Sequence, residues 1–131
     1  MKKIFFIALV LLMSICAFAQ QKGAVISWEK TIHNFGIIKM EDGLQKYRFV
    51  FVNTGDEPLY LSRVKSGCGC TTADYTKEPI APGAKGYVEV IFNPENRLGI
   101  FDKNITVVCN ATSKPVSNLK INGIVIVSKV N

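Results

Sequence analysis

The chain is made of short stretches in which apolar and polar residues alternate. The clearest are KYRFVFVN (46–53), LYLSRV (59–64), YVEVIF (87–92), KNITVVCN (103–110) and LKINGIVIV (119–127). Glycine, proline and asparagine separate these stretches, and a period of two with many Val, Ile, Phe and Tyr residues is typical of strands that bury one face. We therefore predict an all-β, immunoglobulin-like antiparallel sandwich of about seven strands in two sheets.

Residues 1–19 have the pattern of a signal peptide. Two lysines precede an apolar run, and the sequence AFA at 17–19 matches a small-residue cleavage site. A retained membrane anchor is an alternative, although the apolar run is short for a span of about 20 residues. Attachment as a lipoprotein through Cys16 is another. We predict an exported protein of the periplasm or cell envelope, or one released from the cell, with a single domain over residues 20–131.

The charge pattern narrows the choice of partners. The formal net charge is +6, and the lysines and arginines are scattered along the chain. A nucleic-acid surface needs a dense basic patch. We predict no nucleic-acid partner and no integral membrane span after the signal peptide is removed.

Two long stretches of the sequence resemble a known family. FGIIKMEDGLQKYRFVFVNTGDEPLYL begins at Phe35, and GCGCTTADYTKEPIAPGAKGYVEVIFNPENRLGIFDKNITVVCNA begins at Gly67. They resemble the exported bacterial family filed as domain of unknown function fifteen seventy-three. Phe35-Gly36 and Asn53 to Leu59 extend the resemblance, more distantly, to the immunoglobulin-fold domains of PapD-like chaperones, the major sperm protein and cilium-associated proteins. The resemblance implies the fold, but the closer family has no agreed activity, so it implies no function.

Three cysteines follow the signal peptide, and one glycine separates the first two, Cys68 and Cys70. One interpretation is structural, with buried thiols and at most one disulfide, from Cys109 to Cys68 or Cys70 across the sandwich. A bond between Cys68 and Cys70 would close a very small ring that is strained and easily reduced, which makes thiol-disulfide exchange conceivable. The usual redox motif is C-x-x-C at the start of a helix, and no helix is predicted after Cys70.

Soft-metal binding is a further interpretation of the same cysteines. Two thiolates one residue apart could hold Cu(I), and Cys109 or His33 could complete the site. Zinc sites favour a wider spacing, and His33 is the only histidine of the chain. We assign no metal ligands, and Cys68 and Cys70 are the residues that a thiol or copper site would use.

No pattern of residues in the chain indicates an enzyme. The motifs G-x-S-x-G and H-E-x-x-H are absent, and the glycines of PGAKG (82–86) precede a predicted strand where a phosphate site would need a helix. We predict no enzymatic activity, no catalytic residues and no cofactor.

The predicted function is that of an exported binding or structural module that engages a protein partner through strand edges or loops. Ile124 and Ile126 lie opposite the predicted core face of the last strand, which is a candidate edge strand, and an exposed β-branched pair there indicates an unknown protein partner or self-association. The alternative function is thiol-disulfide redox chemistry or copper handling by the Cys-Gly-Cys motif.

Overall fold

The computed structural model describes residues 23–128, so the predicted signal peptide and Cys16 lie outside the described residues. These residues form eight strands and one short 3₁₀ helix. The elements are β1 (Ile26–Trp28), β2 (Ile32–Lys39), η2 (Met40–Asp42), β3 (Gln45–Asn53), β4 (Leu61–Ser66), β5 (Thr71–Tyr75), β6 (Lys85–Phe92), β7 (Gly99–Cys109) and β8 (Val116–Ile126). No helix among residues 23–128 is long and apolar enough to cross a membrane.

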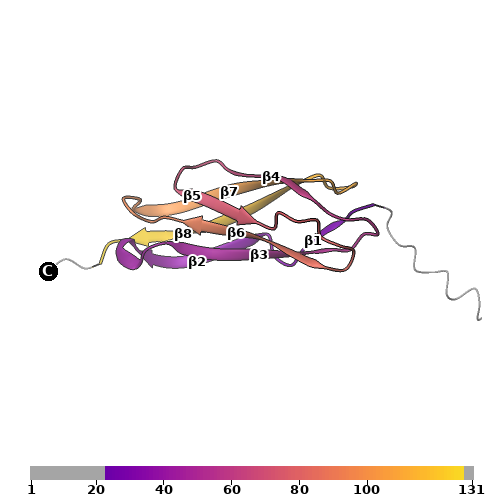
Figure 1. Cartoon of the computed structure of the whole chain (residues 1–131). Coiled ribbons are helices and arrows are strands. Elements are labelled where there is room, and N and C mark those ends of the chain that lie inside the picture. Colours follow the sequence, from indigo (N-terminus) through magenta and orange to yellow (C-terminus); the bar gives the residue numbers. More distant parts are fainter. Residues whose placement is uncertain (1–22, 129–131) are drawn as a thin grey trace, which may run out of the picture.

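The strands form two four-stranded sheets that pack face to face (Figure 1). One sheet has the order β1-β3-β6-β5 and the other has the order β2-β8-β7-β4. The predicted all-β sandwich is confirmed. The prediction of purely antiparallel sheets is wrong at one place, because β2 pairs in parallel with β8. The chain leaves the first sheet after β1 and crosses to the second, where it runs alongside the last strand.

The core lies between the sheets and follows the alternation of the sequence. The fully buried large apolar side chains are Phe49, Phe51, Val88, Val90 and Phe92 from one sheet and Ile105, Val107, Leu119, Ile121 and Val125 from the other. Burying each such side chain is worth about 1.5–3 kcal/mol. The inward faces of both sheets therefore supply the main stabilisation of the fold.

Asn53 is a buried polar residue that fastens the turn after β3 to the rest of the sandwich. Its Oδ1 accepts hydrogen bonds from the backbone N–H groups of Val25, at 3.3 Å, and Gly55, at 3.0 Å. Its Nδ2 donates to the carbonyl oxygens of Glu57, at 2.7 Å, and Ile80, at 2.9 Å. The carboxamide thus joins three segments of backbone that are distant in sequence.

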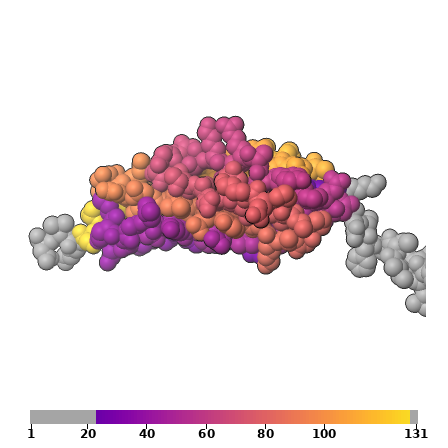
Figure 2. Space-filling view, in the orientation of Figure 1, coloured from indigo at the N-terminus to yellow at the C-terminus, as the bar shows by residue number. Residues whose placement is uncertain are grey.

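The sandwich is elongated, and its two ends carry different loops (Figure 2). A shallow pocket at one end is lined by residues of η2, of the β6–β7 loop and of the segment after β8, among them Met40, Asn93 and Val127. The opposite end carries the turn after Asn53 and the β7–β8 loop, where the Thr112 N–H donates to the Ala24 carbonyl oxygen at 3.2 Å.

Candidate functional site

The Cys-Gly-Cys turn lies where the chain crosses from one sheet to the other. It connects β4 to β5, and each of these strands is at the edge of its own sheet. A disulfide joins Cys68 to Cys70, with 5.3 Å between the Cα atoms. Cys70 is buried, with 5% of its surface exposed, whereas Cys68 is only partly buried. The two sulfurs of the bond therefore have different access to solvent.

Hydrogen bonds hold the turn on both sides of the disulfide. The Cys70 N–H donates to the Cys68 Sγ at 3.3 Å, and the Thr71 N–H donates to the Cys68 carbonyl oxygen at 3.2 Å. The Ser66 hydroxyl donates to the same carbonyl at 3.1 Å. The Asn93 N–H donates to the Cys70 carbonyl oxygen at 2.9 Å, which ties the turn to the β6–β7 loop.

Cys109 is a free, buried thiol. The expected disulfide from Cys109 to Cys68 or Cys70 is therefore wrong, because Cys68 and Cys70 are bonded to each other. The strand register gives the reason. Ser66, at the end of β4 next to the turn, pairs with Ile105 of β7. Cys109 is four residues further along β7, which is about 13 Å. A disulfide requires Cα atoms about 4.4–6.8 Å apart.

The Cys109 thiol is also poorly suited to reaction. Burial raises the pKa of this thiol, and a backbone hydrogen bond from Ala111 offsets only part of the effect. The Cys109 Sγ lies 3.6 Å from the carbonyl oxygen of Lys114 and donates to it. Cys109 is therefore a neutral core residue at neutral pH.

His33 lies far from the cysteines and packs among aromatic rings. It is on β2, at the opposite edge of its sheet from β4, so three strand spacings, or about 14 Å, separate the two strands. Its ring stacks on Tyr47, with centroids 3.7 Å apart, and meets Phe35 edge-on. Burial, and to a smaller degree the charge of Lys30, lower the pKa of His33. His33 is a packing residue that bridges the two sheets and does not complete a site with Cys68.

No cluster of metal-binding side chains is present within residues 23–128. No three His, Cys, Asp or Glu side chains come together there in an arrangement that could hold a metal ion. In the disulfide form the sulfurs of Cys68 and Cys70 are bonded to each other, so binding of Cu(I) would require their reduction first.

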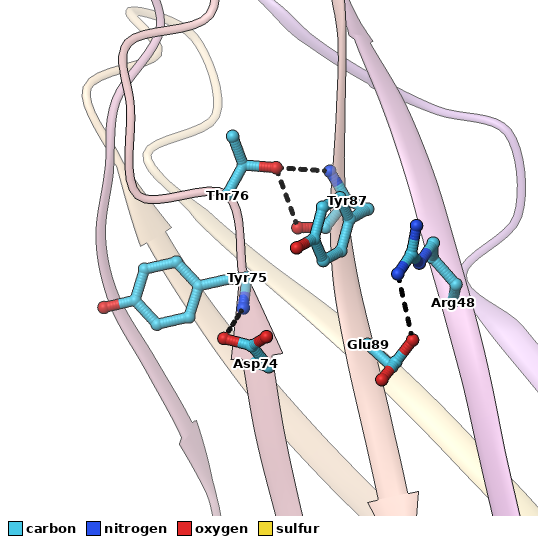
Figure 3. A network of polar contacts seen from close by, with 6 residues as sticks. All are labelled: Arg48, Asp74, Tyr75, Thr76, Tyr87 and Glu89. Carbon is cyan, nitrogen blue, oxygen red and sulfur yellow. Dashed lines mark hydrogen bonds and ion pairs between the residues drawn. The ribbon is translucent and has the colours of Figure 1, made fainter.

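The outer face of the β1-β3-β6-β5 sheet carries a patch of polar groups that pair with one another (Figure 3). Arg48 and Glu89, on neighbouring strands, form an ion pair at 3.2 Å, and the Arg48 guanidinium lies 4.0 Å from the centre of the Tyr87 ring. The Thr76 hydroxyl oxygen accepts a hydrogen bond from the Tyr87 N–H at 3.0 Å. The charged and polar groups of this patch already have partners within the sheet.

The outer face of the other sheet carries exposed isoleucines, which we call the isoleucine surface: Ile37, Ile100, Ile124 and Ile126. Ile37 of β2 and Ile100 of β7 both pair in register with Ile124 of β8. The exposed fractions are 71% for Ile37, 85% for Ile100, 41% for Ile124 and 40% for Ile126. The side chains are therefore contiguous across three neighbouring strands and remain in contact with solvent.

The predicted edge position of Ile124 and Ile126 is wrong, although the two side chains do point outward. β8 lies inside its sheet, between β2 and β7. Its main chain is hydrogen-bonded on both sides and cannot accept an added strand. Any interaction of these isoleucines must therefore use the face of the sheet.

A shallow groove lies within the isoleucine surface, because Ile37, Ile100 and Ile124 line it. Its lining includes Asn34 and Gly36 of β2, Asp102 of β7 and Asn122 of β8. The Asn34 Oδ1 accepts a hydrogen bond from the Gly36 N–H at 2.7 Å, and this contact supports a β-bulge between Asn34 and Ile37. The Asn122 Oδ1 is buried and has no hydrogen-bond partner within the described residues. The groove thus has largely apolar walls, and one of its lining residues carries a buried oxygen without a hydrogen bond.

The family of the chain follows from its sequence match. A family model described as "Protein of unknown function (DUF1573)" matches residues 26–125. The chain belongs to this family. A search of curated proteins finds no match.

Solved structures similar to this DUF1573 protein support the fold class. A protein of unknown function from Porphyromonas gingivalis W83 is 20% identical with a TM-score of 0.71, and the match covers 82% of this chain and 50% of that chain. The DUF1573 chain thus spans half the length of that protein. PapD-like domain 7 of human CEP192 is 9% identical with a TM-score of 0.67, covering 86% of this chain and 93% of that one.

A third similar structure is WR4, a member of the MSP family from C. elegans. It is 9% identical with a TM-score of 0.50, and the match covers 79% of this chain and 100% of that chain. At such low identities these similarities establish the fold alone, which is the expected immunoglobulin-like sandwich.

Sequence reasoning on this DUF1573 protein missed half of the isoleucine surface. Ile37 and Ile100 lie in FGII and LGIF, where glycines interrupt the alternation and hide the outward phase. The observable signal was an isoleucine beside a glycine in both stretches. Their proximity to Ile124 depends on strand order, which no local pattern reports.

Proposed function

We propose that this DUF1573 protein is an exported, non-enzymatic binding module that holds an extended apolar segment of a protein partner on its isoleucine surface. The supporting observation is the register of Ile37, Ile124 and Ile100 on three adjacent strands, all solvent-exposed. Large contiguous apolar patches on a soluble surface mark sites of interaction. Full burial of an exposed isoleucine is worth about 1.5–3 kcal/mol, and because Ile124 and Ile126 are already more than half covered, the four side chains would supply part of the roughly 8 kcal/mol of a micromolar complex.

Three further features support this choice of surface and partner. The opposite outer face is occupied by the paired groups around Arg48 and Glu89, so the two faces differ in chemistry. The groove offers the exposed carboxylate of Asp102, which lies 3.6 Å from the Lys120 ammonium and whose oxygens suit the N–H groups of an extended peptide. The signal-peptide pattern of residues 1–19 supports export.

Site-specific crosslinking in cells tests the proposal. A photo-crosslinking residue placed at Ile100 should capture one predominant protein, and Ile124→Lys in the same chain should reduce the yield at least tenfold. The matched control places the crosslinker at Asn118, which lies on the same outer face of β8 but toward its other end. Sedimentation of the purified protein measures self-association in parallel.

The outcomes show whether a different protein or a second copy of this chain binds the isoleucine surface. A single crosslinked partner at position 100, absent at position 118, supports the proposal. Crosslinks between two copies of the chain, together with a dimer in sedimentation, would overturn it in favour of self-association. Equal labelling at both positions, or none at position 100, would also overturn it.

We propose thiol-disulfide exchange at the Cys-Gly-Cys turn as a second candidate function. The observation that favours it is the bond between Cys68 and Cys70 at an exposed connection between edge strands. The variant Cys68→Ser/Cys70→Ser should lose exchange with dithiothreitol while keeping the crosslink at Ile100. An unchanged rate of dithiothreitol oxidation by this double variant would refute the second candidate.

A further inference from the structure

The two sulfurs of the Cys68–Cys70 bond are open to attack to different degrees. Cys70 is 5% exposed and packs in the core, and Cys68 is partly exposed. Cys68 packs against the rim of the core, and its two neighbours Gly67 and Gly69 are exposed and have no side chain that could cover it. A thiolate that approaches the turn from solvent therefore reaches the sulfur of Cys68 first.

The surroundings of Cys70 suit a leaving group. When a disulfide is attacked at one sulfur, the other departs as a thiolate, and it departs faster when its pKa is lower. Burial alone would make this thiolate costly. The hydroxyl oxygen of Thr71, itself buried, lies 3.6 Å from the Cys70 Sγ and can donate a hydrogen bond to the departing thiolate.

The backbone also stabilises the turn while its sulfurs change partners. The Cys70 N–H already points to the Cys68 Sγ, and hydrogen bonds from Thr71 and Asn93 hold the carbonyl oxygens of both cysteines. None of these hydrogen bonds requires the disulfide to be closed. The turn can therefore keep its shape when the sulfur-sulfur bond opens.

We propose that Cys68 is the sulfur that exchanges with a protein dithiol and that Cys70 is the leaving sulfur, an inference that rests on the second candidate function. A thiolate of the dithiol attacks the Cys68 Sγ, the Cys68–Cys70 bond breaks, and its electron pair passes to the Cys70 Sγ, which takes up a proton from water. The second thiol of the dithiol then loses its proton and attacks the first sulfur of the dithiol, which is bonded to the Cys68 Sγ. This mixed disulfide breaks, and Cys68 leaves as a thiolate that takes up a proton from water. The turn gains two electrons and two protons, and the dithiol becomes a disulfide.

Trapping the mixed disulfide on the wild-type protein tests this polarity. The probe is a C-x-x-C dithiol protein whose second cysteine is replaced by serine, so that the first exchange cannot be resolved. The complex is digested without reduction, and mass spectrometry identifies the cysteine attached to the probe. We expect at least tenfold more attachment at Cys68 than at Cys70. Attachment to Cys70, or to both equally, would overturn the polarity.

A separate measurement distinguishes failure of the polarity from failure of the exchange itself. If the intact dithiol probe and dithiothreitol both leave the folded Cys68–Cys70 bond oxidised, the second candidate function fails together with the polarity. The variant Thr71→Val measures the contribution of Thr71 and should slow the exchange about tenfold. The matched control is Thr72→Val, on the exposed face of β5, which should exchange at the wild-type rate. Equal rates for the two variants would remove Thr71 from the proposal.

Discussion

Asn53→Ala should destabilise the fold strongly because it removes all four hydrogen bonds of a buried carboxamide. The backbone N–H groups of Val25 and Gly55 would lose their acceptor in a partly buried place. A buried donor left without an acceptor costs about 1–3 kcal/mol. The bond to Val25 is the longer of the two, at 3.3 Å, so its loss belongs at the lower end of that range.

The two carbonyl oxygens that Asn53 binds would lose less. The Ile80 carbonyl also accepts from the Leu59 N–H at 2.9 Å, and Glu57 is exposed to water. The expected loss in the free energy of unfolding is therefore about 3 kcal/mol in total. With an m-value of about 1–1.5 kcal/mol per molar urea, the midpoint of unfolding should fall by about 2–3 M.

Urea unfolding followed by tryptophan fluorescence measures this loss. Trp28 is the only tryptophan of the chain, and its ring lies 5.0 Å from that of Phe51 in the folded core. The matched control is Asn104→Ala, at an exposed position of β7, which should change the free energy by less than about 0.5 kcal/mol. If Asn53→Ala and Asn104→Ala unfold at the same urea concentration, the reasoning about the buried carboxamide is wrong.

Three other outcomes are expected. Because the pKa of His33 is lowered in the folded state, the unfolded chain binds the proton more tightly, and the stability contributed by the neutral ring should be lost as the pH falls through the folded-state pKa. The urea midpoint of His33→Gln should therefore change less between pH 7.5 and 5.5 than that of the wild type, and an equal change in both proteins would contradict this. Gly123→Ala should lower the free energy of unfolding by about 1–3 kcal/mol, because its Cβ would lie 2.8 Å from the Phe101 ring. Gly67→Ala is the control, since open space surrounds Gly67 and the melting temperature should not change. Equal melting temperatures for the two variants would refute the steric argument. Cys109 should react with iodoacetamide only after unfolding, since it is buried and its pKa is raised, and rapid labelling of the native protein would count against this.

The alternation of the sequence predicted the faces of the strands well. The alternation of KYRFVFVN puts Tyr47, Phe49 and Phe51 on one face, and all three lie toward the interior. The outward phase of Ile124 and Ile126 was also correct. Alternation reports which side of a strand is buried, because successive side chains point to opposite faces.

The alternation could not predict which strands lie next to each other. The position of Ile124 in a central strand follows from the return of β2 to pair with β8, a contact between the two ends of the described chain. The expected pairing of Cys109 failed for a similar reason, because the register of β4 on β7 sets how far Cys109 lies from the turn. Strand order is a property of the folded chain, and a local period of two excludes only those registers that shift a strand by an odd number of residues.

The parallel pairing of β2 with β8 gives the sandwich a direction in which it should resist mechanical force. The start of the described chain, before β1, and the end of β8 lie at opposite ends of the long axis (Figure 1). A pull on these two ends acts first on the short strand β1, which pairs with β3. Once β1 has detached, the pull would slide β2 and β8 in opposite directions, and the hydrogen bonds of their ladder, which run across the strands, would share the load. Forced unfolding is governed by the rate of crossing such a barrier. A protein of this shape, held at one end and loaded at the other, would behave as a stiff link.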